Sequence, residues 1–474
     1  MDKHNDTIVA VASGSGGAIA IIRLSGPDAV AVCDQVFRAA SGQKLDSAAG
    51  YTLHYGEIFD PKDSGRTVDD VMVALFRAPR SYTGEDSVEI SCHGSRYIRQ
   101  RIVELLLKHG ARSAEAGEFT LRAFLNGKMD LSQAEAVADL IASADKAAYT
   151  VAANQIRGGY SAEFASLRSE LLTLVSLLEL ELDFGEEDVE FADRSRLARL
   201  MEETRAKIAK LARSFSYGNV LKEGVAVAIA GNPNVGKSTL LNTLVNDDRV
   251  MVSDIAGTTR DVVEESMVIG GVRFRFLDTA GIRHTEDALE KMGIERTYTS
   301  IEKANIILLM AEAGATKEAT LSNISEALAA IRIQPSQHLC IVVNKIDSGD
   351  AAAPSHEELA VALPSLQERR FGYVRISAKY GQNTDQLIEY LSSVADAQPF
   401  MDGETVVFNS RHYEALIRAQ EAISRATDGL SMNAPTDLLA QDIRETLHHL
   451  GTITGEITTD EILGNIFSKF CIGK

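Results

Sequence analysis

Short apolar runs alternate with amphipathic stretches over the first quarter of the chain. Residues 7–12 and 18–24 are apolar and are separated by the glycine-rich segment 13–17, so they predict two short strands joined by a turn. Pro27 favours the first turn of a helix, which we expect to run towards Ala40. The same reasoning predicts strands at 51–59, 68–76 and 87–92 and a helix at 97–108.

Apolar positions at helical spacing dominate from residue 118 to residue 215. Between 222 and 398 strands and helices alternate, which predicts a parallel sheet, and after Pro399 the pattern is helical again. We therefore expect an α/β domain inserted into a discontinuous helical domain, since neighbouring termini make insertion easy. The predicted boundaries are an N-terminal α+β domain at 1–121, helical parts at 122–217 and 393–474, and the inserted domain at 218–392.

Charge and cysteine usage narrow the class of protein. The chain of 474 residues has 48 Lys and Arg against 67 Asp and Glu, a net charge of −19, which argues against a general polyanion or DNA binder. A local exception is the segment 94–128, with seven Lys and Arg against three Glu, which is either a nucleic-acid patch or a solvated helix face. Four scattered cysteines favour a reducing cytoplasm, and neither a signal peptide nor a membrane-spanning stretch is visible.

A phosphate-loop pattern follows the apolar run Val225–Ala230 and precedes a helix. This strand–loop–helix order lets backbone N–H groups and the helix N-terminus cradle phosphates. In such a loop Lys237 bridges the outer phosphates and the Ser238 hydroxyl binds Mg²⁺. The residues expected to contact the nucleotide here are Asn234, Val235, Gly236, Lys237, Ser238 and Thr239.

Guanine selectivity is predicted by Asn344-Lys345-Ile346-Asp347, which follows the apolar run 339–343. The Asp347 carboxylate can accept from guanine N1–H and its exocyclic amine, a pair of donors that adenine lacks. Lys345 can lie along the base, and Ser377-Ala378-Lys379 follows the next strand and can offer a backbone N–H to the guanine oxygen. With the phosphate loop, this order indicates a Ras-like P-loop G domain that binds GTP.

Two further elements lie between these motifs. Asp278-Thr279-Ala280-Gly281 ends a predicted strand, where Asp278 would hold Mg²⁺ through water and Gly281 would face the γ-phosphate. Thr259 is the expected second Mg²⁺ ligand, in a loop that would order with GTP and relax after hydrolysis. Ile282 stands where Ras-type GTPases have a water-orienting glutamine, so other groups must position the water and offset the developing charge.

The whole chain closely resembles the MnmE (TrmE) family of tRNA-modification GTPases. The resemblance rests on GNPNVGKST, DIAGTTRD, DTAGIR followed by Glu290, NKID, TGED, GEFTLRAFLNGKMDLSQAEA and the final FCIGK. It implies a dimerising N-terminal domain that binds folate, a discontinuous helical domain and an inserted G domain. It also implies that Glu290 orients the attacking water. It further implies that K⁺, held by Asn234, Ser253, Ile255 and Thr258, supplies the positive charge that an arginine finger provides in other GTPases. The loop expected to contact GTP and K⁺ comprises Ser253, Asp254, Ile255, Ala256, Gly257 and Thr258.

For the N-terminal domain the resemblance implies 5-formyltetrahydrofolate or a 5,10-methylene-type tetrahydrofolate. Arg23 and Lys128 match positions suited to the anionic glutamate tail, Glu85 matches one that pairs with the pterin, and Lys474 is expected nearby. Ser13-Gly14-Ser15 departs from the proline-bearing segment usual in relatives. Cys471 either takes part in the modification chemistry or belongs to a structural tail.

Three functions are weighed. The first is a cytoplasmic, homodimeric GTPase that works with an FAD-dependent partner, MnmG (GidA), on carbon 5 of the wobble uridine of tRNA. The second is a ribosome-assembly GTPase similar to Era or Der, although the chain carries neither a GxxG RNA-binding loop nor a second phosphate loop. The third is a folate-dependent transferase with a regulatory G domain.

Overall fold

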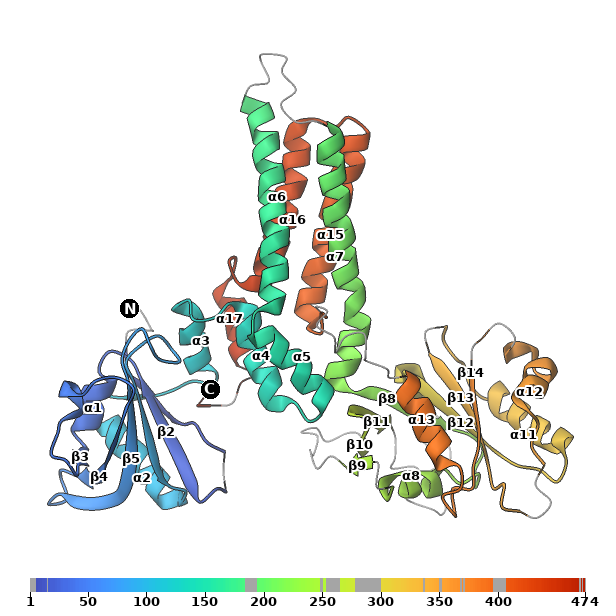
Figure 1. Cartoon of the computed structure of the whole chain (residues 1–474), viewed down its shortest axis with the longest axis horizontal. Coiled ribbons are helices and arrows are strands. Elements are labelled where there is room, and N and C mark those ends of the chain that lie inside the picture. Colours follow the sequence, from blue (N-terminus) through green and yellow to red (C-terminus); the bar gives the residue numbers. More distant parts are fainter. Residues whose placement is uncertain are drawn as a thin grey trace. The chain divides into compact units, whose positions relative to one another are not determined.

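The computed structural model describes residues 6–14, 16–183, 194–247, 250–252, 265–277, 300–335, 337–348, 352–366, 369, 371–394, 406–468, 470 and 472–473. The chain forms two compact units. Unit 1 comprises Met1–Ala138, Gln155–Met201 and Arg425–Lys474, and unit 2 comprises Asp139–Asn154 and Glu202–Ser424. Figure 1 labels their helices and strands along the chain.

Unit 1 contains a seven-stranded sheet in the order β3-β4-β5-β6-β2-β1-β7. Its strands are β1 (Ile8–Val11), β2 (Ile19–Ser25), β3 (Phe37–Ala39), β4 (Thr52–Asp60), β5 (Arg66–Phe76), β6 (Ser87–His93) and β7 (Arg112–Ser113). The helices α1 (Ala29–Asp34) and α2 (Arg96–Lys108) pack on one face, against alternate strand residues such as Ile22 and Leu24. Arg23 lies between these two residues and therefore projects to the opposite face.

The expected helix from Pro27 towards Ala40 is wrong in its second half. The helix ends at Asp34, and Phe37–Ala39 forms strand β3, in which Phe37 pairs with Ile58 of β4. Phe37 is buried in this pairing. An aromatic side chain gains more from a partner strand than from the end of a short helix, and this partner is remote in sequence.

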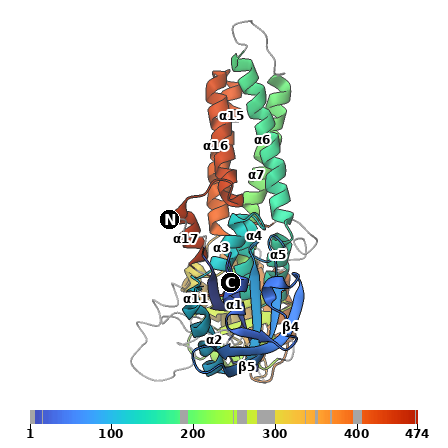
Figure 2. The same cartoon turned by 90° about the vertical axis from the view of Figure 1, so that its left-hand side faces the viewer.

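The helical parts of the chain lie on both sides of the second sheet in sequence, and their helices are divided between the two units. Their members are α3 (Glu118–Leu125), α4 (Leu131–Ala142), α5 (Lys146–Ile156), α6 (Gly159–Asp183), α7 (Arg194–Glu223), α15 (Ser410–Ser431), α16 (Thr436–Thr454) and α17 (Asp460–Phe467). Within unit 1, α16 packs along α6, and Arg444 pairs with Glu179 between them (Figure 2).

The segment after α17 is docked on the N-terminal part of unit 1. Phe467 and Phe470 pack against Leu131 and Ala134, and Ile472 forms an antiparallel bridge with Ala116. A Cβ on Gly473 would lie 2.3 Å from the carbonyl oxygen of Val11, so only glycine fits there.

Unit 2 contains a second seven-stranded sheet, in the order β14-β13-β12-β8-β11-β10-β9. Its strands are β8 (Val225–Ala230), β9 (Val250–Val252), β10 (Glu265–Ile269), β11 (Val272–Leu277), β12 (Ile306–Glu312), β13 (His338–Asn344) and β14 (Phe371–Arg375). The five strands from β14 to β11 are parallel, as the alternation of elements predicted, whereas β10 pairs antiparallel with β11 and β9 pairs antiparallel with β10.

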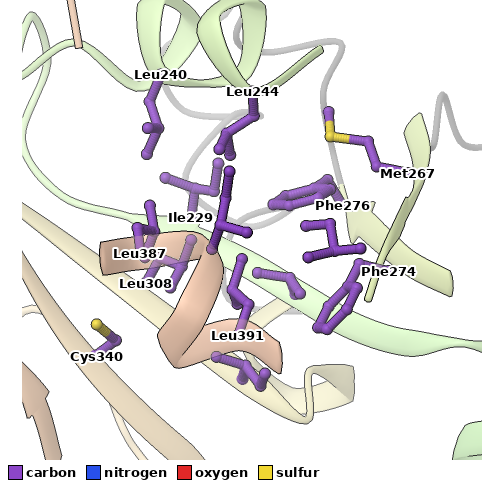
Figure 3. Close-up of a cluster of buried hydrophobic side chains, with 14 of the residues drawn as sticks. Ile229, Leu240, Leu244, Met267, Phe274, Phe276, Leu308, Cys340, Leu387 and Leu391 are labelled. Carbon is purple, nitrogen blue, oxygen red and sulfur yellow. The ribbon is translucent and has the colours of Figure 1, made fainter. Parts of the chain in front are cut away.

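Helices cover both faces of this second sheet. On one face, α8 (Lys237–Val245) and α13 (Thr384–Val394) bury Leu240, Leu244, Leu387 and Leu391 against Ile229 and its neighbours (Figure 3). On the other, α11 (Lys317–Ala329) and α12 (His356–Ala362) bury Ile324 and Leu359 against the strands. The sheet is therefore buried on both sides, and its loops emerge only at the strand ends.

Candidate functional site

The loops that follow β8, β12, β13 and β14 share one edge of the unit 2 sheet, because these strands are parallel. The phosphate-loop motif occupies residues 231–236, between β8 and α8. Gly231 and Gly236 have φ angles of +141° and +98°, and a Cβ would lie 2.2 Å from the Met310 oxygen at Gly231 and 2.3 Å from Asn344 Nδ2 at Gly236. Asn234 is also left-handed, with φ of +63°. This backbone needs its glycines.

Lys237 points back into this loop. Its ammonium donates to the carbonyl oxygens of Gly231 at 2.7 Å and Asn232 at 3.0 Å. Burial lowers the pKa of Lys237 below its ordinary value. Both oxygens belong to neutral groups, so the loop presents a desolvated cation that an anionic phosphate would stabilise.

Asn344 joins the phosphate loop to the base loop. Its Nδ2 donates to the Val235 oxygen at 2.7 Å, and its Oδ1 accepts from the backbone N–H of Ala378 at 2.9 Å. Thr243 of α8 adds a hydrogen bond of 2.6 Å to the Ala378 oxygen. Asn344 is only 3% exposed, so the two nucleotide loops share one buried tie.

Lys345 and Asp347 emerge beyond this tie. Lys345 has a φ of +66°, and its ammonium pairs with a Glu312 carboxylate oxygen at 2.8 Å. Asp347 is exposed. Glu312 ends β12, the neighbour of β13, and no sequence motif indicates it, because its contact with Lys345 depends on the pairing of the two strands.

Several predicted residues of this site lie outside the described residues. They are Ser253, Asp254, Ile255, Ala256, Gly257, Thr258, Thr259, Asp278, Thr279, Ala280, Gly281 and Glu290. Ser238, Thr239, Ser377 and Lys379 are described and belong to the same strand edge. Their assignment to GTP and Mg²⁺ stays a prediction.

The candidate folate residues of unit 1 surround the segment 78–86. Arg23 pairs with Glu89 at 2.8 Å, and its guanidinium lies over the rings of Tyr82 and Phe119 at 5.3 Å and 5.6 Å. Lys128 donates to the Pro79 oxygen at 3.1 Å. Glu85 is on the same segment, so all three predicted residues contact or belong to it.

Glu85 is held by two groups. Ser25 Oγ donates to its Oε2 at 2.7 Å, and Arg122 Nη1 lies 3.2 Å and 3.3 Å from Oε1 and Oε2. Arg122 also donates to Asp6 Oδ1 at 2.6 Å and Glu118 Oε1 at 3.0 Å. Burial alone would lower the pKa of Arg122, but the opposing charge of Glu85, with the hydrogen bonds that Arg122 donates to Glu118 and Asp6, raises it above its ordinary value.

Arg112 pairs with the other two acids of this cluster. It donates to Asp6 and to Glu118 at 2.6 Å each. Chiefly through the hydrogen bond from Arg112, the pKa of Asp6 falls to about 2. Arg122 was not predicted as a partner of Glu85, although it lies within the motif GEFTLRAFLNGKMDLSQAEA.

The other candidate residues are at the C-terminus, in the basic segment 94–128 and at Cys92-His93. Cys471 and Lys474 lie outside the described residues. In the basic segment 94–128, Arg101, Arg112 and Arg122 are all in ion pairs, which weakens the interpretation of this segment as a nucleic-acid patch.

Cys92 is buried, and the neighbouring His93 pairs with Asp69 at 2.7 Å. No cluster of three or more His, Cys, Asp or Glu that could hold a metal occurs among the described residues.

Two family models match the chain. The model described as GTP-binding protein TrmE N-terminus matches residues 7–128, and the MnmE helical domain model matches residues 131–471. Within the part of the chain that the structure describes, no helix is long and apolar enough to cross a membrane.

Relatives match over the full length. A Christiangramia forsetii protein named tRNA modification GTPase MnmE is 49% identical over 481 residues, covering 100% of both chains. A Bacteroides fragilis protein of the same name is 50% identical over 473 residues, covering 99% of this chain and 100% of its own. Among solved structures, a variant of Aquifex aeolicus Era bound to GDP.AlF4⁻ is 28% identical and covers 41% of this chain and 65% of its own, with a TM-score of 0.23, too low to support an argument.

Proposed function

Because the chain belongs to the MnmE family of tRNA modification GTPases, we propose that its GTP hydrolysis drives modification of carbon 5 of the wobble uridine. The chain is a GTP hydrolase that acts in tRNA modification. The proposal adds a cytoplasmic homodimer, the FAD-dependent partner MnmG (GidA), and a one-carbon unit from a tetrahydrofolate. The observation that supports the GTPase part of the proposal is the buried Asn344 side chain, which hydrogen-bonds to the phosphate loop and to the segment after β14. The full-length similarity to tRNA modification GTPases supports the tRNA part.

Within this proposal, Mg²⁺ is held by Ser238 and Thr259, with Asp278 acting through water. K⁺ is held by Asn234, Ser253, Ile255 and Thr258; bound there, it would supply positive charge beside the β- and γ-phosphate oxygens. Glu290 orients the attacking water in place of the glutamine that Ile282 replaces.

The folate part of the proposal rests on unit 1. Arg23 and Lys128 bind the anionic tail and Glu85 binds the donor edge of the pterin, with Lys474 nearby and Cys471 available for the modification chemistry. The convergence of the first three residues on the segment 78–86 supports this assignment. The accompanying domain division is 1–121, 122–217, 218–392 and 393–474.

Nucleoside mass spectrometry of total tRNA tests the function. Deletion of the gene should remove the 5-substituted wobble uridine, and the wild-type gene should restore it whereas Asp278→Ala should not. A variant at an exposed residue of unit 2 remote from the loops, Val361→Ala, is the matched control and should restore it. An unchanged nucleoside profile after deletion would contradict the wobble-uridine proposal and favour ribosome assembly.

A further inference from the structure

Glu85, which is proposed to bind the pterin, shares an arginine partner with two other acidic residues. Glu85 is one of three carboxylates, with Asp6 and Glu118, that surround the guanidinium of Arg122. The Arg122 side chain is 1% exposed, whereas the Glu85 side chain keeps 17% of its surface exposed. A ligand can therefore reach the carboxylate and not the guanidinium behind it.

Ser25 holds the same carboxylate from a second direction. Its hydroxyl donates to Glu85 Oε2 at 2.7 Å and lies 2.6 Å from the Thr83 hydroxyl. Thr83 Oγ1 in turn accepts from the backbone N–H of Glu85 at 3.3 Å. The main chain and the side chain of Glu85 are thus both held in place by hydrogen bonds. A carboxylate that accepts hydrogen bonds from two adjacent N–H groups requires such preorganisation.

We propose that Arg122 is a positioning residue for folate recognition, which aims the Glu85 carboxylate at the N–H donors of a reduced pterin without contacting the ligand. The inference rests on the proposed folate function. A buried carboxylate without a compensating cation is costly, and a bond from a charged donor is stronger and more directional than a neutral one. Loss of Arg122 should therefore release Glu85 from the orientation that selects the ligand.

Arg112 provides the matched control. It pairs with Asp6 and Glu118, as Arg122 does. Within the described part of the chain, Arg112 donates hydrogen bonds to Asp6, Glu118 and the Ser113 oxygen. Arg112→Met removes a charged partner of the same two acids and leaves the contacts to Glu85 in place, although the Arg112 side chain is 40% exposed against 1% for Arg122. The difference between the two variants isolates the effect on Glu85.

The experiment measures two affinities by calorimetry for the full-length wild type, Arg122→Met, Arg122→Lys and Arg112→Met. The ligands are 5-formyltetrahydrofolate and its 4-amino-4-deoxy analogue, whose N3 carries no proton to donate. The wild type and Arg112→Met should prefer the first ligand by a similar ratio. Arg122→Met should reduce that preference by roughly 10- to 100-fold, and Arg122→Lys should restore part of it. Thermal unfolding of each full-length variant reports whether unit 1 is folded, and GTP hydrolysis, which belongs to the other unit, should be unchanged in all of them.

The outcomes separate the two proposals. A wild type that binds neither ligand overturns the folate function and this inference together. A wild type that binds and discriminates, with the same ratio retained in Arg122→Met, overturns the inference alone. An equal loss of ratio in Arg112→Met also overturns it, because the effect would then be a general loss of structure in the cluster.

Discussion

Asn344 and Val235 are joined by a hydrogen bond of 2.7 Å, although one residue ends β13 and the other belongs to the loop after β8. The same side chain accepts from Ala378, so its amide serves two loops at once. Asn344 therefore has a structural role, which is to connect two loops, and this role is distinct from contact with the base.

Replacing Asn344 by alanine should weaken GDP binding about 10-fold or more, because a buried carbonyl and a buried N–H would lose their partner. Titration with a fluorescent GDP measures this. Asn246→Ala is the control, since the Asn246 amide donates to the Asn242 oxygen within α8 and, among the described residues, joins no second loop. Equal affinities for the two variants would show that the tie does not hold the site together.

Gly236→Ala should abolish nucleotide binding more completely. The added Cβ would lie 2.3 Å from Asn344 Nδ2, and the φ of +98° is one that alanine avoids. Gly464→Ala is the matched control, because nothing lies within 4 Å of a Cβ there and α17 should gain helix propensity. Near-normal GDP binding by Gly236→Ala would contradict the tight packing of the loop.

GTP hydrolysis should be faster in K⁺ than in Na⁺ at the same ionic strength, by on the order of 10-fold or more, since charge placed beside the transferring phosphoryl group stabilises the transition state. Steady-state phosphate release measures the rates, and Asn234→Ala should reduce the difference between the two salts. Equal rates of the wild type in both salts would rule out the assigned K⁺ site.

Asp145→Asn should stabilise unit 2 at neutral pH. Burial raises the pKa of Asp145, and its Oδ2 has no hydrogen-bond partner among the described residues. A raised pKa means that this carboxyl favours folding at acidic pH and that the benefit is lost as pH rises through the folded pKa. Asparagine keeps the bond of 2.8 Å from the Ala148 N–H to Oδ1 and carries no charge.

Thermal unfolding at pH 7 and at pH 4 checks this expectation. The gain from Asp145→Asn should be larger at pH 7 than at pH 4, while exposed Asp385→Asn in the first turn of α13 should show no such trend. A gain that is the same at both pH values would show that Asp145 does not titrate in the way its burial implies.

Local patterns explain which parts of this molecule could be predicted. The strand Val225–Ala230 was predicted with the correct bounds, as was the position of the loop after it. Both could be predicted because a buried parallel strand and a glycine-rich phosphate loop are each defined by a run of consecutive residues. The mixed α/β and helical composition of the fold was also correct. Strand β3 was missed, since its only advantage over a helix is pairing with a strand some twenty residues later.

The parts of the sites that escaped prediction depend on long-range pairing. Glu312 reaches Lys345 only because β12 and β13 are neighbours in the sheet. Arg122 reaches Glu85 and Asp6 from a helix that is remote from both in sequence. Neither acid–base pair has a spacing that a motif could record, so only the assembled fold reveals it.

The docking of Ile472 beside Ala116 also sets the order in which unit 1 can be completed during translation. About 350 residues separate the two strands of this bridge, which takes a ribosome roughly 20–70 s to synthesise. During that interval the apolar surface around Leu131 and Ala134 lacks the covering rings of Phe467 and Phe470. The nascent chain therefore leaves this apolar surface of unit 1 without its covering residues until Phe467 and Phe470 have been synthesised.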